Sequence, residues 1–157
     1  MQATHAGQAT TRGGGTEGWQ SPEVMMDEGA TTASDIFSLG LLFFFVLTEG
    51  KHCFGELGAK RTRAMTRFAT TDVEDEEEVA EADAKVGKRV AAALAGGEGD
   101  AELIAKMLRL VPGGRPSAEE VLGSELLREP ADSLIFATSI YISMKCSHET
   151  ELITELN

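Results

Sequence analysis

The chain has 157 residues, of which 42% are hydrophobic and 25% are charged, and its formal net charge is −12. Such a length and composition are typical of one globular domain with enough apolar material for a core. The acidic balance argues against a nucleic-acid partner, because the phosphate backbone would be repelled. The two cysteines, Cys53 and Cys146, are too few for a disulfide scaffold and indicate a reducing compartment.

Two apolar runs, Ile36–Leu47 and Ser133–Met144, are both well short of the roughly 20 residues that a membrane-spanning helix needs. We interpret both runs as buried elements and predict no membrane span in this chain. Residues 1–5 lack the basic and apolar regions of a secretory signal.

The first predicted helix begins at Ser21. Residues 1–15 are mostly small and polar without apolar periodicity, and we assign 1–11 to a disordered segment. Ser21, Pro22 and Glu23 then offer an N-cap, a proline at the first helical position and an acid in the first turn, which predicts a short helix to about Met26.

A long helix is predicted over residues 31–48, with Thr32 or Ser34 as its cap. The segment is apolar almost all round, which is typical of a helix buried in a core. Its three consecutive phenylalanines, 43–45, must point in three directions, so neighbours should surround it. A strand is the competing interpretation, but the length of the segment favours a helix.

Opposite charges follow one another in the middle of the chain. Residues 56–68, to which we assign no element, carry four bases, and residues 72–83 carry eight acids. We interpret the acidic run as a solvated face rather than a site for cations or basic partners. An exposed helix is predicted from about Glu76 to Leu94, with Glu81 and Lys85 spaced for an ion pair and a stop at Gly96 and Gly97.

Two further helices are predicted before residue 128. The segment from Asp100 to Leu110 is amphipathic, with Asp100 as its cap and a stripe of Leu103, Ile104, Met107 and Leu108. After the break "VPGGRP", Ser117 to Glu120 form a capping box that opens a helix to about Leu122. Its apolar face is supplied by Val121, Leu122, Leu126 and Leu127. Residues 130–157 show no firm pattern.

Three motifs in order resemble a protein kinase. "GTEGWQSPE", residues 15–23, resembles the end of an activation segment, with Ser21 in place of the usual alanine. "SDIFSLG", residues 34–40, resembles the start of the central helix of the C-terminal lobe, and "GGRPSAEEVL", residues 113–122, its arginine turn and final helix. "GTEGW" and "TEGKHCFG" are similar to the inositol-requiring endoplasmic-reticulum stress sensors, which join a Ser/Thr kinase to an endoribonuclease.

The resemblance covers about residues 12–127, although 56–99 match poorly. Cys53 stands where the family has the proline of its His-Pro-Phe-Gly turn. Val111 stands where the family usually has an aspartate, before the proline of the arginine turn. The resemblance implies a mainly α fold. This fold would be the helical C-terminal lobe of a protein-kinase-like fold, without its N-lobe and catalytic loops. The lobe would extend over residues 12–129, with 56–99 as a divergent acidic insert and 130–157 as an unassigned tail.

The resemblance also implies a family activity, ATP-dependent protein phosphorylation with ATP and Mg²⁺. The sequence has no Gly-rich loop upstream of these motifs, no His-Arg-Asp and no Asp-Phe-Gly, which position phosphates, metal and hydroxyl in kinases. We therefore expect an inactive isolated chain that needs no cofactor. The alternatives are a catalytically dead, pseudokinase-like module that binds a protein partner through an exposed lobe face, or an incomplete gene product. Complete relatives are endoplasmic-reticulum membrane proteins, which implies the cytoplasmic side.

By resemblance, Glu23 and Arg115 form a buried ion pair that ties the activation segment to the lower lobe. The alternative is two surface charges of no consequence. Asp35 matches the aspartate that binds the backbone of the catalytic loop; here it is expected to be a helix-start acid or simply exposed.

Three further groups of candidate residues remain. Those that match the substrate-contacting loop are Gly15, Thr16, Gly18 and Trp19, with packing as the alternative role of Trp19. Thr10 and Thr11 match a region that is phosphorylated in active relatives. His52, Cys53, Cys146 and His148 are of the residue types that bind zinc. Their spacing fits no standard zinc motif, and we expect no metal.

Overall fold

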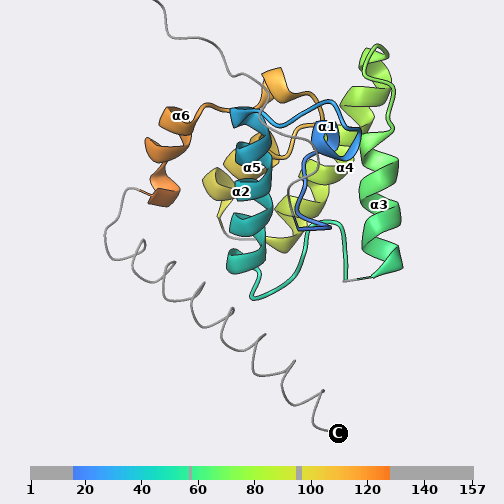
Figure 1. Ribbon diagram of the computed structural model, residues 1–157. Coiled ribbons are helices and arrows are strands. Elements are labelled where there is room, and N and C mark those ends of the chain that lie inside the picture. The colour runs from blue at the N-terminus through green and yellow to red at the C-terminus, as the bar shows by residue number, and fades with distance from the viewer. Residues whose placement is uncertain (1–15, 57, 95–96, 128–157) are drawn as a thin grey trace, which may run out of the picture.

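The computed structural model describes residues 16–56, 58–94 and 97–127 (Figure 1). This part of the chain contains helices and no strand, which confirms the mainly α prediction. Its α-helices are α1 (Pro22–Met25), α2 (Thr32–Leu47), α3 (Ala59–Ala69), α4 (Glu76–Ala93), α5 (Glu98–Met107) and α6 (Ala118–Leu122). Two short 3₁₀ turns, η1 and η2, cover Pro112–Gly114 and Glu125–Leu127.

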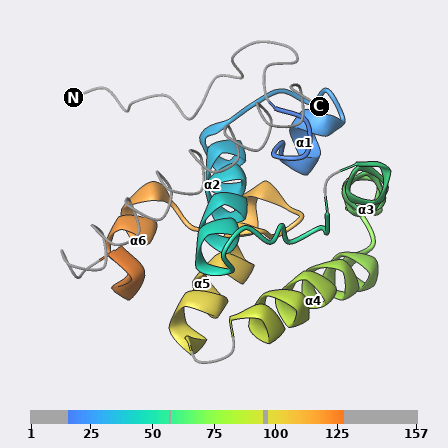
Figure 2. The same ribbon diagram turned by 90° about the horizontal axis from the view of Figure 1, so that it is seen from below.

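Helix α2 lies at the centre of the fold. It packs on α5, and α5 packs in turn on α4, while α6 and α3 lie on opposite sides of α2 in both views (Figures 1 and 2). Phe37 and Leu41 of α2 are fully buried, as are Ile104 and Met107 of α5. The prediction of a long buried helix is therefore confirmed.

The three consecutive phenylalanines of α2, residues 43–45, have neighbours on several sides, as the sequence predicted. Phe43 and Phe44 are buried in the core, and Phe45 is half-buried against the ring of Trp19, with 5.5 Å between the ring centroids. A helix whose side chains are covered in several directions explains why the sequence shows no polar stripe there.

Gly40 sets the distance between α2 and α5. A Cβ atom at this position would lie 2.8 Å from the Cβ of Met107 and 3.2 Å from Leu108. A side chain larger than hydrogen would therefore force the two helices apart. The glycine belongs to the motif "SDIFSLG", so this motif has a packing role.

The helix caps differ from prediction in three places. Thr31, not Thr32, is the N-cap of α2, and its backbone N–H donates to the Ser34 hydroxyl at 3.0 Å. Ser21 is the N-cap of α1 by position, but its hydroxyl makes no capping bond. Helix α5 begins at Glu98 after Gly97, so Asp100 lies in its first turn and does not cap it.

The end of the described chain follows the sequence closely. Ser117 and Glu120 form the predicted capping box, in which the Ser117 N–H donates to Glu120 at 2.7 Å. Val121 is buried, but Leu122 is 69% exposed and therefore does not contribute to the apolar face that we assigned to it.

Helix α3 lies where the sequence analysis assigned no element. Its inner face is formed by Met65 and Phe68 together with the largely buried chain of Arg61. Helix α4 lies where one was predicted, and it buries Val86 and Val90 in the same core. Within the described residues no helix combines the length and apolarity needed to cross a membrane.

Candidate functional site

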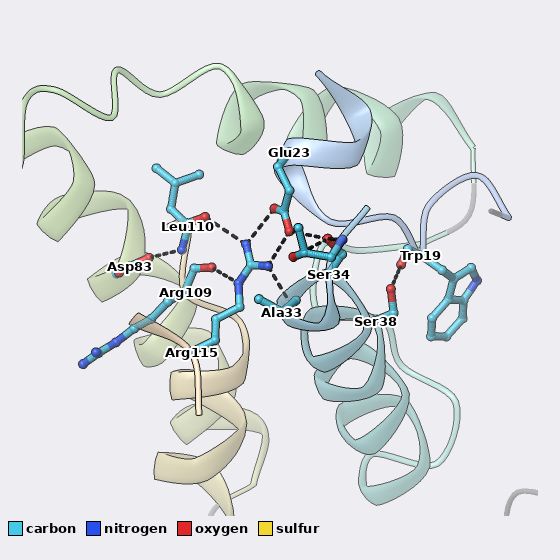
Figure 3. Close-up of polar contacts among 10 residues, drawn as sticks. Trp19, Glu23, Ala33, Ser34, Ser38, Asp83, Arg109, Leu110 and Arg115 are labelled. Atoms are coloured by element: carbon cyan, nitrogen blue, oxygen red, sulfur yellow. Dashed lines mark hydrogen bonds and ion pairs between the residues drawn. The ribbon is translucent and has the colours of Figure 1, made fainter. Parts of the chain in front are cut away.

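Arg115 is the centre of a buried polar cluster (Figure 3). Its two terminal nitrogens donate to the two carboxylate oxygens of Glu23 at 2.7 and 2.9 Å. The remaining N–H groups donate to the backbone carbonyls of Ala33, Arg109 and Leu110, each at 2.9 Å. All five donors of the guanidinium are thus used, which an ammonium with three donors could not reproduce.

This cluster is closed to solvent. The side chain of Arg115 is 0% exposed and that of Glu23 7% exposed. The guanidinium carbon also lies 4.9 Å from the centroid of the Phe37 ring, so an aromatic face covers the cation. A buried charge without its partner would be costly, and each member of the pair therefore depends on the other.

Ser34 completes the environment of Glu23. Its hydroxyl donates to the carboxylate at 2.7 Å and accepts the backbone N–H of Thr31. Burial alone would raise the pKa of Glu23, but the hydrogen bonds from Arg115, the backbone and Ser34 outweigh it and lower the pKa below its ordinary value. Sequence reasoning assigned Ser34 only to helix capping and missed this contact.

The structure thus brings together the residues of all three sequence motifs. Glu23 comes from the first motif, Arg115 from the third, and Ser34 and the Ala33 carbonyl from the start of α2. Arg115 and Glu23 are 92 residues apart in sequence. No periodicity could have paired them, and the expectation came from the family resemblance.

Asp83 takes part in the same region and was missed. It is half-buried, and its carboxylate accepts the backbone N–H of Leu110 at 2.8 Å. The Leu110 carbonyl oxygen also accepts a hydrogen bond from Arg115, so Asp83 holds in place a segment of backbone that supports the ion pair. The solvated face predicted for residues 72–83 is therefore wrong for Asp83.

The loop before α1 is fixed by Trp19. Its backbone carbonyl accepts the Ser38 hydroxyl at 2.8 Å, and its ring makes edge contacts with Phe45 and, at 5.0 Å, with His52. Gly18 has φ +86°, and a Cβ there would lie 3.1 Å from Arg61. The Trp19 ring therefore has the packing role that we gave as its alternative.

Beside this loop is a hollow of about 450 Å³, lined by residues that include Thr16, Ser21, Asp35 and Leu42. Asp35 is exposed and lies in the first turn of α2. The Ser21 hydroxyl is buried without a partner among the described residues. Gly15, Thr10 and Thr11 lie outside the described part of the chain.

The residues that line this hollow do not fit ATP with Mg²⁺. Asp35 is the one ionisable side chain among the described residues that line the hollow. In residues 16–56, 58–94 and 97–127, no three side chains of His, Cys, Asp or Glu come together to hold a metal ion. Phosphoryl transfer needs metal ligands and a residue that orients the hydroxyl, and no step can be derived from this donor set.

His52 and Cys53 are buried in the turn after α2. Burial and the nearby charge of Arg61 lower the pKa of His52 to about 4, although the Gly18 backbone opposes the shift. Burial raises the pKa of Cys53 to about 11, against the effect of Arg89. A neutral imidazole and a protonated thiol in this setting are packing groups. The imagined zinc partners, Cys146 and His148, lie outside the described residues.

Comparison with known proteins identifies the family. The sequence model described as "Protein kinase domain" matches residues 2–127. The chain belongs to the protein kinase domain family. Its described part corresponds to the helical C-terminal lobe, which confirms the predicted fold class.

Several relatives are kinase/endoribonucleases, as the motifs indicated. The serine/threonine-protein kinase/endoribonuclease IRE2 of Homo sapiens is 34% identical over 125 residues, 78% of this chain and 12% of that protein. IRE1 of Hypocrea jecorina is 28% identical over 88% of this chain and 13% of its own length. IRE1b of Arabidopsis thaliana is 48% identical over 48 residues, 31% of this chain and 5% of its own. The chain thus spans between 5% and 13% of the length of these relatives.

Proposed function

We propose that this chain is the lower C-lobe portion of a serine/threonine protein kinase of the stress-sensor type, and that it transfers no phosphate by itself. The observation that carries the proposal is the Arg115 cluster. One side chain joins the activation-segment motif, the start of the central helix and the arginine turn. These three segments are the ones whose sequences resemble a protein kinase.

The proposed inactivity is supported by the sequence of this chain. The groups that kinases use to hold phosphates, metal and substrate hydroxyl have no candidates in it. In a complete kinase of the family, ATP and Mg²⁺ would be held by those groups, and the present residues would support the activation segment from below. In that setting the chain would lie on the cytoplasmic side of the endoplasmic-reticulum membrane.

The test is a phosphorylation assay with the purified chain, radiolabelled ATP, Mg²⁺ and a generic basic protein substrate. We expect no transfer above the background without protein. Transfer that disappears in the Asp35→Asn variant would contradict the proposal, since Asp35 is exposed and its replacement leaves the core intact. Transfer at equal rates with both proteins would indicate a contaminating kinase.

The second candidate is a non-catalytic module that binds a protein partner. Large apolar side chains that are exposed in the described part lie on separate elements, for example Met26, Val73 and Leu122. The charged face of α3 is the feature that favours this candidate.

A further inference from the structure

Apart from Ala59, the exposed face of α3 carries hydroxyls and cations. Its exposed side chains recur three and four residues apart, a spacing that places them on one side of a helix. The segment contains no aspartate or glutamate, although the whole chain has a net charge of −12. We define the α3 face by five residues: Thr62, Arg63, Thr66, Arg67 and Thr70.

Two cations on the neighbouring helices are paired within their own helix, whereas the described part of the chain shows no ion pair for the cations of α3. Lys85 of α4 pairs with Glu81, and Lys106 of α5 pairs with Glu102, each at 2.8 Å. Among the described residues Arg63 has no carboxylate at ion-pair distance, and Arg67 only contributes, as a minor cause, to lowering the pKa of Glu81. The positive charge of the α3 face is therefore available to a ligand.

A hollow of about 690 Å³ lies over this face and is lined by all five of its residues. Glu17, from the loop before α1, borders the hollow at Thr62, whose hydroxyl donates to the Glu17 carboxylate at 3.2 Å. One carboxylate of the chain is thus already bound by a hydroxyl of the α3 face. Arg63, Thr66 and Arg67 offer the same kind of donors without a carboxylate partner among the described residues, whereas the Thr70 hydroxyl donates to the Arg67 carbonyl at 3.4 Å.

We propose that the α3 face binds a short, carboxylate-rich segment of a protein partner. An arginine fork can hold a carboxylate with two parallel hydrogen bonds, and a threonine hydroxyl can add a third donor. Arg63 and Arg67 lie one turn apart, with Cβ atoms about 5–6 Å from each other. Every second side chain of an extended peptide is about 7 Å from the next on the same side, which the long arginine side chains can match.

The surroundings of the face favour a short peptide over a nucleic acid. The exposed acids of residues 72–78 follow directly after α3 and would repel a long polyanion that extended past the helix. The net charge of −12 also disfavours the binding of nucleic acid, which is itself negatively charged. The inference does not depend on catalysis, so it holds for the full chain whether or not a complete kinase contains it.

The experiment measures fluorescence anisotropy of a labelled peptide of four glutamates alternating with serines, titrated with the full chain at low salt. We expect saturable binding that weakens as salt is added. Arg63→Gln with Arg67→Gln should weaken binding about fivefold or more. The matched control, Lys51→Gln with Lys88→Gln, removes the same charge from exposed positions elsewhere and should leave the affinity within about twofold.

A charge-reversal variant distinguishes loss of the binding site from loss of the fold. The variant Arg63→Glu with Arg67→Glu should lose the glutamate peptide and gain binding of a matching lysine–serine peptide, which an unfolded chain would not do selectively. Equal weakening by the two glutamine pairs would overturn the proposal, because it would indicate non-specific attraction. So would the absence of saturable binding by the unaltered chain, or tighter binding of a short oligothymidylate of equal charge.

Discussion

Two kinds of ion pair occur in this molecule at nearly the same distance. Arg115 and Glu23 approach to 2.7 Å, and Lys85 and Glu81 to 2.8 Å. The first pair is buried and joins segments 92 residues apart, whereas the second lies on one exposed helix face. Distance alone therefore does not rank them. Desolvation and the number of hydrogen bonds decide which of the two holds the fold together.

Removing the buried cation should have the largest effect. Arg115→Ala leaves the Glu23 carboxylate buried without its partner and frees three backbone carbonyls, so we expect a loss of about 3–5 kcal/mol in unfolding free energy. Urea unfolding followed by circular dichroism measures it. An unchanged midpoint would mean that the cluster does not hold these segments.

Much of the fold, but less of this cluster, could be predicted from the sequence. The helix over residues 32–47 and the capping box at Ser117 follow from local signals. Helix α3 was missed because its inner face includes Arg61. An arginine counts as polar in a hydrophobicity pattern, although this side chain is buried. Asp83 was missed because it stands within a run of exposed acids, and nothing local separates it from them.

The contact between α2 and α5 stabilises the fold by apolar packing, whereas the buried pair does so by charge and hydrogen bonds. Gly40→Ala should cost about 1–3 kcal/mol, because the added Cβ overlaps Met107. Gly87→Ala is the matched control: its Cβ would lie 4.0 Å from Ala105, so the better helix propensity of alanine should stabilise the protein by up to about 1 kcal/mol. Both are measured by thermal unfolding, and equal shifts of the two midpoints would argue against a tight helix contact.

Acid should weaken the buried pair in a defined direction. The pKa of Glu23 is lower in the folded chain than in the unfolded one, so its contribution is fully present above the unfolded pKa, about 4.3, and is lost as pH falls through the folded value. We expect a smaller pH slope of the unfolding free energy below that pH in Glu23→Gln than in the unaltered chain. Exposed acids such as Glu102 titrate in both proteins, so parallel slopes would show that Glu23 contributes nothing.

The exposed pair should give the smallest effect. Lys85→Ala removes the partner of Glu81 on a face where water solvates both charges. We expect a thermal midpoint that matches the unaltered chain within the error of repeat measurements. A clear decrease would mean that surface charge on α4 matters more than its exposure indicates.

The most direct test of the account is a pair of double-mutant cycles on unfolding free energy. One combines Glu23→Gln with Arg115→Met, and the other Glu81→Gln with Lys85→Met. The account predicts a coupling energy above about 1 kcal/mol for the first pair, and none that can be distinguished from zero for the second. Equal coupling in the two cycles would contradict the claim that the buried cluster joins the three motifs of this lobe.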